Sequence, residues 1–155
     1  AVLVHPDGTE EILKDSIPTE DGIQLTVDGS ATVKIVDNSK GFIDTQDHWA
    51  KDEISIAYNN GWITGYPDGT FGPQRDITRA ETMTLVNRVL NRQPETEDDL
   101  LPNMTVWTGN ANPKAWYYLA VQEATNSHYY KFKTNSKYEK WSELRETRDW
   151  TQLEK

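Results

Sequence analysis

The sequence lacks cysteine, has no long apolar run and carries no aromatic residue in positions 1–41. Without cysteine the chain has no disulfide bond, no thiolate metal site and no cysteine nucleophile. Polar residues interrupt the apolar ones every few positions, so the sequence predicts no membrane insertion. All tryptophan, tyrosine and phenylalanine residues lie from Phe42 onward, which indicates a change of structure near that position.

Positive charge is also scarce. The 155 residues include 16 lysines and arginines against 25 aspartates and glutamates, which gives a formal net charge of -9. Binding to nucleic acid requires a basic face, so the composition predicts no nucleic-acid partner. The arginines all lie from Arg75 onward, and one or two of them could still hold an anionic ligand.

Residues 1–41 have the pattern of short β-strands. His5–Gly8 and Asp28–Gly29 are turn sequences, and apolar residues alternate with polar ones around Ile23 and Val33. We expect three or four antiparallel strands here. Because so few strands bury little apolar area, this segment should pack on the rest of the chain or end an upstream β domain.

Two helices that flank a loop are predicted next. Apolar residues at helical spacing occupy positions 49–58, and Asn59–Gly61 is a typical helix end. Residues 62–73 contain three glycines and two prolines, which favours an ordered loop. The second helix is expected over residues 79–91. Its apolar stripe comprises Ala80, Met83, Val86, Val89 and Leu90.

The later chain predicts a linker, a helix and a hairpin. Residues 94–103 begin with an acidic stretch and are expected to form the linker. The helix should run from Asn112, a suitable N-cap followed by Pro113, to Thr125. Residues 129–144 alternate enough to predict a hairpin that turns at 134–136.

An internal repeat connects the first helix with the third. Trp49, Ile54 and Ala57 have the same spacing as Trp116, Val121 and Ala124, which lie 67 residues later. Repeated units usually bury their faces against one another. We therefore expect both tryptophans to be structural residues of the core.

Residues 42–92 resemble the S-layer homology (SLH) domain along their whole length. The features that carry the resemblance are Phe42–Asp44, His48–Ala50, Ile54, Ala57, Gly61, Gly65–Phe71, Pro73 and Ile77–Glu81. Residues 104–128 are similar to the start of a second, degenerate repeat. The expected domains are a β segment at 1–41, an SLH repeat at 42–93, a linker at 94–103, and a degenerate repeat with its tail at 104–155.

The resemblance implies helix–loop–helix units, commonly three per protein, arranged around a pseudo-threefold axis. It also implies an extracellular location in the cell wall or S-layer of a Gram-positive, clostridial-type bacterium. Members of the family attach exported proteins to the wall by binding its secondary polysaccharide in grooves between units. In several members that polysaccharide carries an anionic pyruvate ketal.

This chain departs from the family because only one repeat is complete. The second repeat lacks both the glycine-rich loop and the Thr-Arg-Ala-Glu sequence. One complete unit should leave apolar surface uncovered. We expect the β segment and the aromatic tail to cover it in a monomer, with a trimer as the alternative.

The resemblance makes Arg79 the leading ligand-binding candidate. Its guanidinium could bind a carboxylate through two parallel hydrogen bonds, as a pyruvate ketal requires. The alternative is a solvated residue in the first turn of the helix. Its neighbours Thr78 and Glu81 have capping-box spacing, so we interpret them as structural.

The loop supplies the other ligand-binding candidates, which are Gly65, Tyr66, Asp68 and Trp62. Gly65 and Asp68 match the loop glycine and acidic residue of the family, although turn formation is the favoured explanation for Gly65 and explains Asp68 equally well. Tyr66 and Trp62 could offer flat faces to a sugar, but aromatic residues at this spacing more often belong to a core.

No catalytic or metal-binding pattern is present in the sequence. His5, His48 and His128 lie far apart, without partners at metal-ligand or catalytic-triad spacing. We therefore predict an α+β module without enzymatic activity or cofactor that binds cell-wall polysaccharide. The alternative is a structural or self-association module of a surface protein, with no affinity for glycan.

Overall fold

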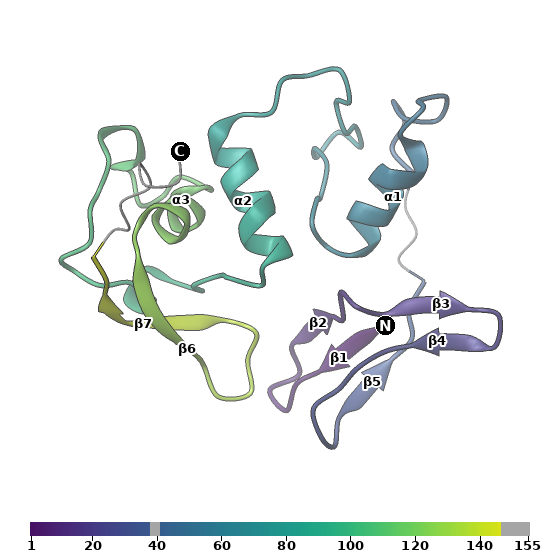
Figure 1. Ribbon diagram of the computed structural model, residues 1–155. Helices are drawn as coiled ribbons and strands as arrows, with labels where there is room; N and C mark the ends of the chain where they lie inside the picture. Colours follow the sequence, from purple (N-terminus) through teal and green to yellow (C-terminus); the bar gives the residue numbers. More distant parts are fainter. Residues whose placement is uncertain (38–40, 147–155) are drawn as a thin grey trace, which may run out of the picture. The chain divides into compact units, whose positions relative to one another are not determined.

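The structure, a computed structural model, describes residues 1–37 and 41–146 (Figure 1). The described residues form three α-helices and seven short β-strands, and every pairing between strands is antiparallel. This composition confirms the predicted α+β class. None of the helices in this part of the chain has the length and apolar character that a membrane span requires.

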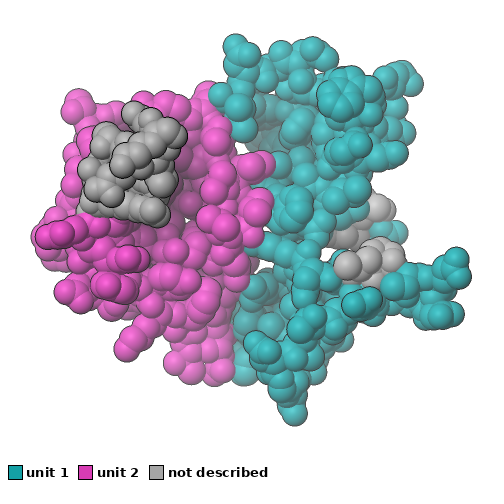
Figure 2. Space-filling view, viewed as in Figure 1, with its two compact units in different colours: residues 1–77 teal, residues 78–155 magenta. Residues whose placement is uncertain are grey.

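The chain divides into two compact units, residues 1–77 and 78–155 (Figure 2). The division falls inside the segment 42–93, so the two helices expected for one repeat belong to different units. Residues 147–155, the end of the expected last domain, lie outside the described residues.

The first unit begins with two small sheets. The strands are β1 (Val2–Val4), β2 (Glu10–Ile12), β3 (Ile17–Thr19), β4 (Gly22–Gln24) and β5 (Thr32–Lys34). One sheet has the order β2-β1-β5, and β3 pairs with β4 in the other. Five strands occur where three or four were predicted because residues 17–24 fold back as a pair of their own. The predicted turn at His5–Gly8 joins β1 to β2.

The helix α1 (Lys51–Asn59) ends as predicted, with Asn60 as its C-cap and Gly61 in the left-handed region at φ 69°. The core beneath it is built around Phe42, which is only 1% exposed. The ring of Phe42 lies 5.5 Å from that of Tyr58 in α1 and 5.6 Å from that of Phe71 in the loop. One phenylalanine thus holds the loop against the helix.

The second unit contains α2 (Arg79–Val89), α3 (Tyr118–Thr125), β6 (His128–Phe132) and β7 (Glu139–Leu144). Single 3-10 turns occur at Glu97–Asp99 and Thr108–Asn110. The helices α2 and α3 pack together, and β6 and β7 form the predicted hairpin, with Asn135 in its turn at φ 57° (Figure 1). Leu100, Tyr118 and Trp141 form the buried core of this unit.

The segment expected as a linker contributes to this core. Leu100 is 8% exposed, and the carboxylate of Asp99 is buried. Asp99 accepts hydrogen bonds from the backbone N–H groups of Glu95 and Thr96, and it pairs with Lys133 at 2.7 Å. Residues 94–103 therefore pack within the second unit, because their leucines and this ion pair anchor them.

Two predictions about α3 and its preceding tryptophan are wrong. The helix begins at Tyr118 and not at Asn112, because residues 112–117 form turns in which the side chain of Asn112 accepts from the N–H of Lys114. Trp116 therefore precedes the helix, and it is 67% exposed.

Trp49 was also expected in the core, and that prediction is wrong for the same reason. It lies two residues before α1, as Trp116 lies two residues before α3, and it is 86% exposed. A residue in the turn before a helix does not share the buried stripe of that helix. The two tryptophans of the internal repeat are thus exposed residues that each precede a helix.

The apolar stripe predicted for α2 is likewise largely exposed. Val86, Val89 and Leu90 are 44%, 43% and 63% exposed, respectively. The buried residue of this helix is Asn87, whose side-chain N–H donates to the carbonyl oxygen of Ala120 at 2.8 Å. A polar contact at the helix crossing therefore replaces the apolar face that periodicity suggested.

The capping box at the start of α2 yields a stability prediction. Thr78 Oγ1 accepts from the N–H of Glu81, and Glu81 Oε2 accepts from the N–H of Thr78 at 2.8 Å. Thr78→Ala should lower the free energy of unfolding by about 1 kcal/mol in urea denaturation. The matched control is Thr82→Ala, an exposed residue four positions later in the same helix, which should change stability little. Equal losses in both variants would contradict the capping role.

Candidate functional site

The loop of the first unit is shaped by a close approach at Gly65. This glycine has a φ of 67°, and a Cβ atom there would lie 2.2 Å from Cε1 of Phe42 and 2.8 Å from the carbonyl oxygen of Thr70. No side chain fits in that space. Gly65 therefore lets the loop cross the buried phenylalanine, which supports its interpretation as a turn-forming residue.

Two aspartates fasten the same loop. Asp68 Oδ1 accepts from both the hydroxyl and the backbone N–H of Thr70, and these hydrogen bonds lower the pKa of the Asp68 carboxyl. Asp44 accepts from the N–H groups of Phe71 at 2.9 Å and Gly72 at 2.7 Å, which lowers its pKa as well. The role of Asp44 in holding the loop was not predicted, although Asp44 belongs to the Phe42–Asp44 motif that carries the family resemblance.

The two aromatic candidates of the loop, Tyr66 and Trp62, are both partly covered. The Arg75 guanidinium lies 4.6 Å from the centre of the Tyr66 ring and covers one face of it. Trp62 is half-buried. Trp49, by contrast, extends from the surface beside His48, whose ring lies 5.5 Å away. Trp49 is thus the most exposed aromatic side chain near this loop.

Arg79, the leading candidate, is the exposed first residue of α2 in the second unit. The four loop candidates belong to the first unit. The structure therefore places the predicted ligand residues in two separate units, each with an exposed tryptophan of its own.

A groove in the second unit brings together residues that sequence reasoning did not connect. It lies between α2 and α3 and has a volume of about 180 Å³. Its lining residues are Thr84, Asn87, Arg88, Arg92, Gln93, Pro94, Trp116, Leu119 and Ala120. We call it the α2–α3 groove. It joins two arginines to an exposed indole, and burial lowers the pKa of Arg88 without removing its charge.

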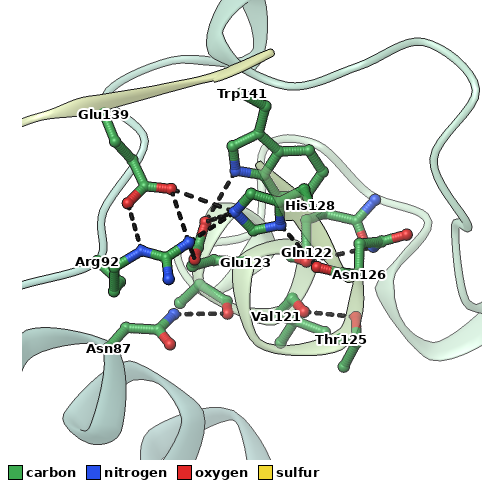
Figure 3. Close-up of polar contacts among 11 residues, drawn as sticks. Asn87, Arg92, Val121, Gln122, Glu123, Thr125, Asn126, His128, Glu139 and Trp141 are labelled. Carbon is green, nitrogen blue, oxygen red and sulfur yellow. Dashed lines mark hydrogen bonds and ion pairs between the residues drawn. The ribbon is translucent and has the colours of Figure 1, made fainter. Parts of the chain in front are cut away.

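Behind this groove lies a buried charge cluster of Arg92, Glu123, His128 and Glu139 (Figure 3). Arg92 donates from Nε to Glu139 at 2.6 Å and pairs through Nη2 with Glu123 at 2.7 Å. His128 Nε2 lies 3.2 Å from Glu123 and 3.3 Å from Glu139. The cluster connects the end of α2 with α3 and both strands of the hairpin.

The ring of His128 is fixed on every side. Nδ1 donates to the carbonyl oxygen of Asn126 at 2.6 Å, and Trp141 stacks on the ring with the centroids 3.9 Å apart. Burial lowers the pKa of His128, but the hydrogen bonds to Glu123 and Glu139 outweigh it and raise the pKa to about 9. The protonated ring balances the cluster at two positive and two negative charges.

Glu123, His128 and Glu139 are close enough to share a metal ion. Their oxygens, however, already accept hydrogen bonds or ion pairs from Arg92, His128 and the indole N–H of Trp141. With these donors in place, we interpret the arrangement as a closed network of ion pairs. His128 has no partner at a regular sequence spacing, because the two glutamates meet it only through the tertiary fold.

Residues 41–83 match the family model of the S-layer homology domain. This segment is an S-layer homology domain. The match confirms the predicted resemblance. It runs from the Phe42–Asp44 motif to the Thr78–Glu81 motif, and the loop at residues 62–73 lies between the two. No solved structure matches the chain.

Curated surface proteins are similar to this chain over part of its length. A cell surface glycoprotein of Acetivibrio thermocellus is 45% identical over 64 residues, which cover 41% of this chain and 3% of the relative. A cellulosome-anchoring protein of the same organism is 36% identical over 92 residues, which cover 59% of this chain and 19% of the relative. An S-layer protein of Bacillus licheniformis is 43% identical over 44 residues, or 28% of this chain and 5% of the relative.

The chain thus spans only a small share of the length of each of these relatives. The SLH domain and the similar surface proteins indicate a cell-surface location attached to the cell wall. They also support a role as a cell-wall anchoring module.

The packing at Gly65 can be tested against a second glycine of the SLH loop. Gly65→Ala introduces both an unfavourable φ and a collision with Phe42, whereas Gly69→Ala has the unfavourable φ of 85° but no neighbour within 4 Å. We expect Gly65→Ala to cost about 1–3 kcal/mol more than Gly69→Ala in thermal or urea unfolding. Similar losses would show that the close approach to Phe42 does not constrain the loop.

The charge cluster predicts how stability depends on pH. Because the folded pKa of His128 is raised from 6.5 to about 9, its contribution is complete below pH 6.5 and is lost as the pH rises through 9. The pKa of Glu139 is instead lowered from 4.5 to about 2, since hydrogen bonds to His128 and Arg92 outweigh burial. Its contribution is complete above pH 4.5 and is lost as the pH falls toward 2.

Urea unfolding between pH 2 and pH 10 measures both the acid loss of stability assigned to Glu139 and the alkaline loss assigned to His128. In His128→Gln the decline from pH 6.5 to 9 should flatten, while His5→Gln should keep the wild-type profile. An unchanged alkaline limb in His128→Gln would contradict the assignment to His128.

Proposed function

We propose that the chain is a noncatalytic module that anchors its parent protein to the bacterial cell wall by binding secondary cell-wall polysaccharide. The observation that carries this proposal is the α2–α3 groove, where Arg88 and Arg92 stand beside the exposed indole of Trp116. The similar cellulosome-anchoring protein supports the anchoring role. In this proposal the location at the cell wall follows from the bound polysaccharide.

The groove has the chemistry that an anionic sugar requires. An indole face packs against the C–H groups of a sugar ring, and a guanidinium binds a carboxylate through charge-assisted hydrogen bonds. At about 180 Å³ the groove is smaller than the roughly 300–1,000 Å³ of ordinary ligand pockets, which suits contact with one unit of a polymer. We assign Trp116 to stacking and Arg88 to the anionic substituent, which we infer to be a pyruvate ketal.

The first unit supplies a second contact in this proposal. Trp49 resembles Trp116 in its place before a helix and in its exposure, so we assign it to sugar stacking as well. Gly65 and Asp68 act by shaping the loop, and Tyr66 and Trp62 line its surface. Arg79 is retained as a ligand residue because its guanidinium is exposed at the start of α2.

Self-association is the second candidate function. The exposed Val86, Val89 and Leu90 on α2 favour it, because a helix of a soluble unit normally buries such residues. In this reading the module has no affinity for glycan, and its apolar helix face joins copies of the chain.

Sedimentation with cell walls separates the two candidates. With walls purified from Acetivibrio thermocellus, the chain should pellet, and walls stripped of polysaccharide by acid should not retain it. Arg88→Gln should weaken binding about tenfold, because it removes one charge-assisted pair. Arg145→Gln is the matched control, since Arg145 lies over the Tyr129 ring outside the groove. Trp116→Ala and Arg79→Ala should also weaken binding at unchanged stability.

Equal sedimentation with intact and stripped walls, or none with either, would reject glycan binding. Oligomers that dissociate in Leu90→Glu would then support self-association. If Arg88→Gln and Arg145→Gln bind equally, glycan binding could stand but the groove would not be its site.

A further inference from the structure

The hairpin of β6 and β7 concentrates positive charge in an acidic chain. Residues 131–140 contain four of the ten lysines of the sequence and one glutamate, although the whole chain has a formal net charge of -9. That glutamate, Glu139, is fully buried and already paired with Arg92. Figure 1 shows the turn of the hairpin projecting away from α2 and α3. The surface of this projecting hairpin is therefore basic.

One of the four lysines has a structural partner. Lys133 Nζ pairs with Asp99 at 2.7 Å and with Glu95 at 2.8 Å, which holds the hairpin to residues 94–103. The other three form no ion pair with any residue that the structure describes. We call these three the lysine patch, which consists of Lys131, Lys137 and Lys140.

Two members of the lysine patch are placed in a way that costs stability. Lys131 in β6 and Lys140 in β7 lie directly opposite each other in the register of the hairpin, and both are exposed. Like charges in directly opposite positions destabilise an antiparallel pair. Such a break of a local rule is expected where residues serve a function and not the fold.

Lys137 extends the patch toward the turn. It lies three residues before Lys140, which separates the two by at most about 10 Å of chain. Its Nζ lies 5.3 Å from the centre of the Tyr138 ring. At physiological ionic strength a charge acts over about 8 Å, so the fields of neighbouring lysines overlap. A polymer that runs along the hairpin can meet all three ammonium groups, whereas a small anion meets one or two.

We propose that the lysine patch binds a linear anionic polymer of the cell wall whose repeating units are joined by phosphodiesters. A lysine ammonium binds phosphate as a point charge and needs no fixed geometry, which suits a flexible chain. Planar carboxylates are recognised better by the fork of an arginine, and the patch contains lysine alone. The patch shares no residue with the α2–α3 groove, so this inference goes beyond the proposed function and does not depend on it.

The location and the total charge of the chain favour a wall polymer over nucleic acid. The SLH domain and the similar surface proteins place the chain at the cell wall. A net charge of -9 opposes the broad contact that nucleic-acid binding requires. The same acidic surroundings repel a polyanion everywhere except at the hairpin, and they thereby direct it to the patch.

Binding of poly(glycerol phosphate) to the full chain tests the inference through its salt dependence. Three neutralised phosphates should raise the dissociation constant about 20-fold between 50 and 200 mM NaCl. Lys131→Gln and Lys140→Gln should each weaken binding and lower the salt slope by about one third. The matched control Lys34→Gln makes the same charge change in the first unit, where Lys34 pairs with Glu10, and should bind like wild type. Wild-type binding that does not depend on salt, or equal binding in all three variants, would overturn the inference.

The melting temperature separates binding from a structural role. Lys131 and Lys140 repel each other, so each variant should melt at the same temperature as wild type or slightly higher. The alternative role for Lys131 is to keep the edge strand β6 from pairing with another copy of the chain. Aggregation of Lys131→Gln with unchanged affinity for the polymer would support that role and overturn the inference.

Two further polymers identify the anion. Polygalacturonate carries carboxylates and should bind more weakly than poly(glycerol phosphate), whereas equal binding would overturn the assignment to phosphate. Oligothymidylate with the same number of phosphates should bind no more tightly, and tighter binding would assign the patch to nucleic acid instead. Poly(glycerol phosphate) has no pyruvate ketal, so its failure to bind would reject the lysine patch and leave the proposed function of the α2–α3 groove standing.

Discussion

A fully buried glutamate, Glu139, organises the second unit. Its carboxylate reaches Arg92 at 2.6 Å and His128 at 3.3 Å, and the backbone N–H of the same residue donates to the carbonyl oxygen of Gln93. One residue of β7 therefore holds both the chain that leaves α2 and the strand β6. Removal of one partner from a buried charge pair lowers the free energy of unfolding by roughly 3–5 kcal/mol. The packing of the hairpin, of α3 and of the chain that follows α2 therefore depends on the contacts of Glu139.

The contacts of Glu139 also determine how one wall of the α2–α3 groove is built. The segment that matches the SLH model is followed by the helix α3 and the hairpin of β6 and β7. The hairpin contributes to the core through Trp141 and carries the glutamate that orders Arg92. A groove wall with Arg88, Arg92 and Trp116 is thus built without a second copy of the Thr-Arg-Ala-Glu helix.

Local signals in the sequence predicted the local structure well. The helix stop at Asn59–Gly61, the capping box of Thr78 with Glu81, and the hairpin turn at Asn135 each depend on neighbours within a few residues, and each is confirmed. The SLH motif set also predicted the family of the central segment.

Contacts between distant residues could not be predicted in the same way. The helical period assigned both tryptophans to the core because it cannot show that α1 and α3 begin two residues later. The charge cluster joins residues 92, 123, 128 and 139, whose spacing has no regular period. Periodicity likewise predicted an apolar face for α2, although Asn87 and a backbone carbonyl make the buried contact with α3.

Glycan binding in the α2–α3 groove is tested best by locating the bound sugar on the full chain. We suggest mapping the indole N–H resonances of the tryptophans by NMR during titration with solubilised cell-wall polysaccharide. We expect the indole N–H resonance of Trp116 to shift and that of the buried Trp141 to follow through the charge cluster, with both shifts reduced in Arg88→Gln. A saturable response that leaves Trp116 unchanged would contradict the assignment of the α2–α3 groove as the glycan-binding surface.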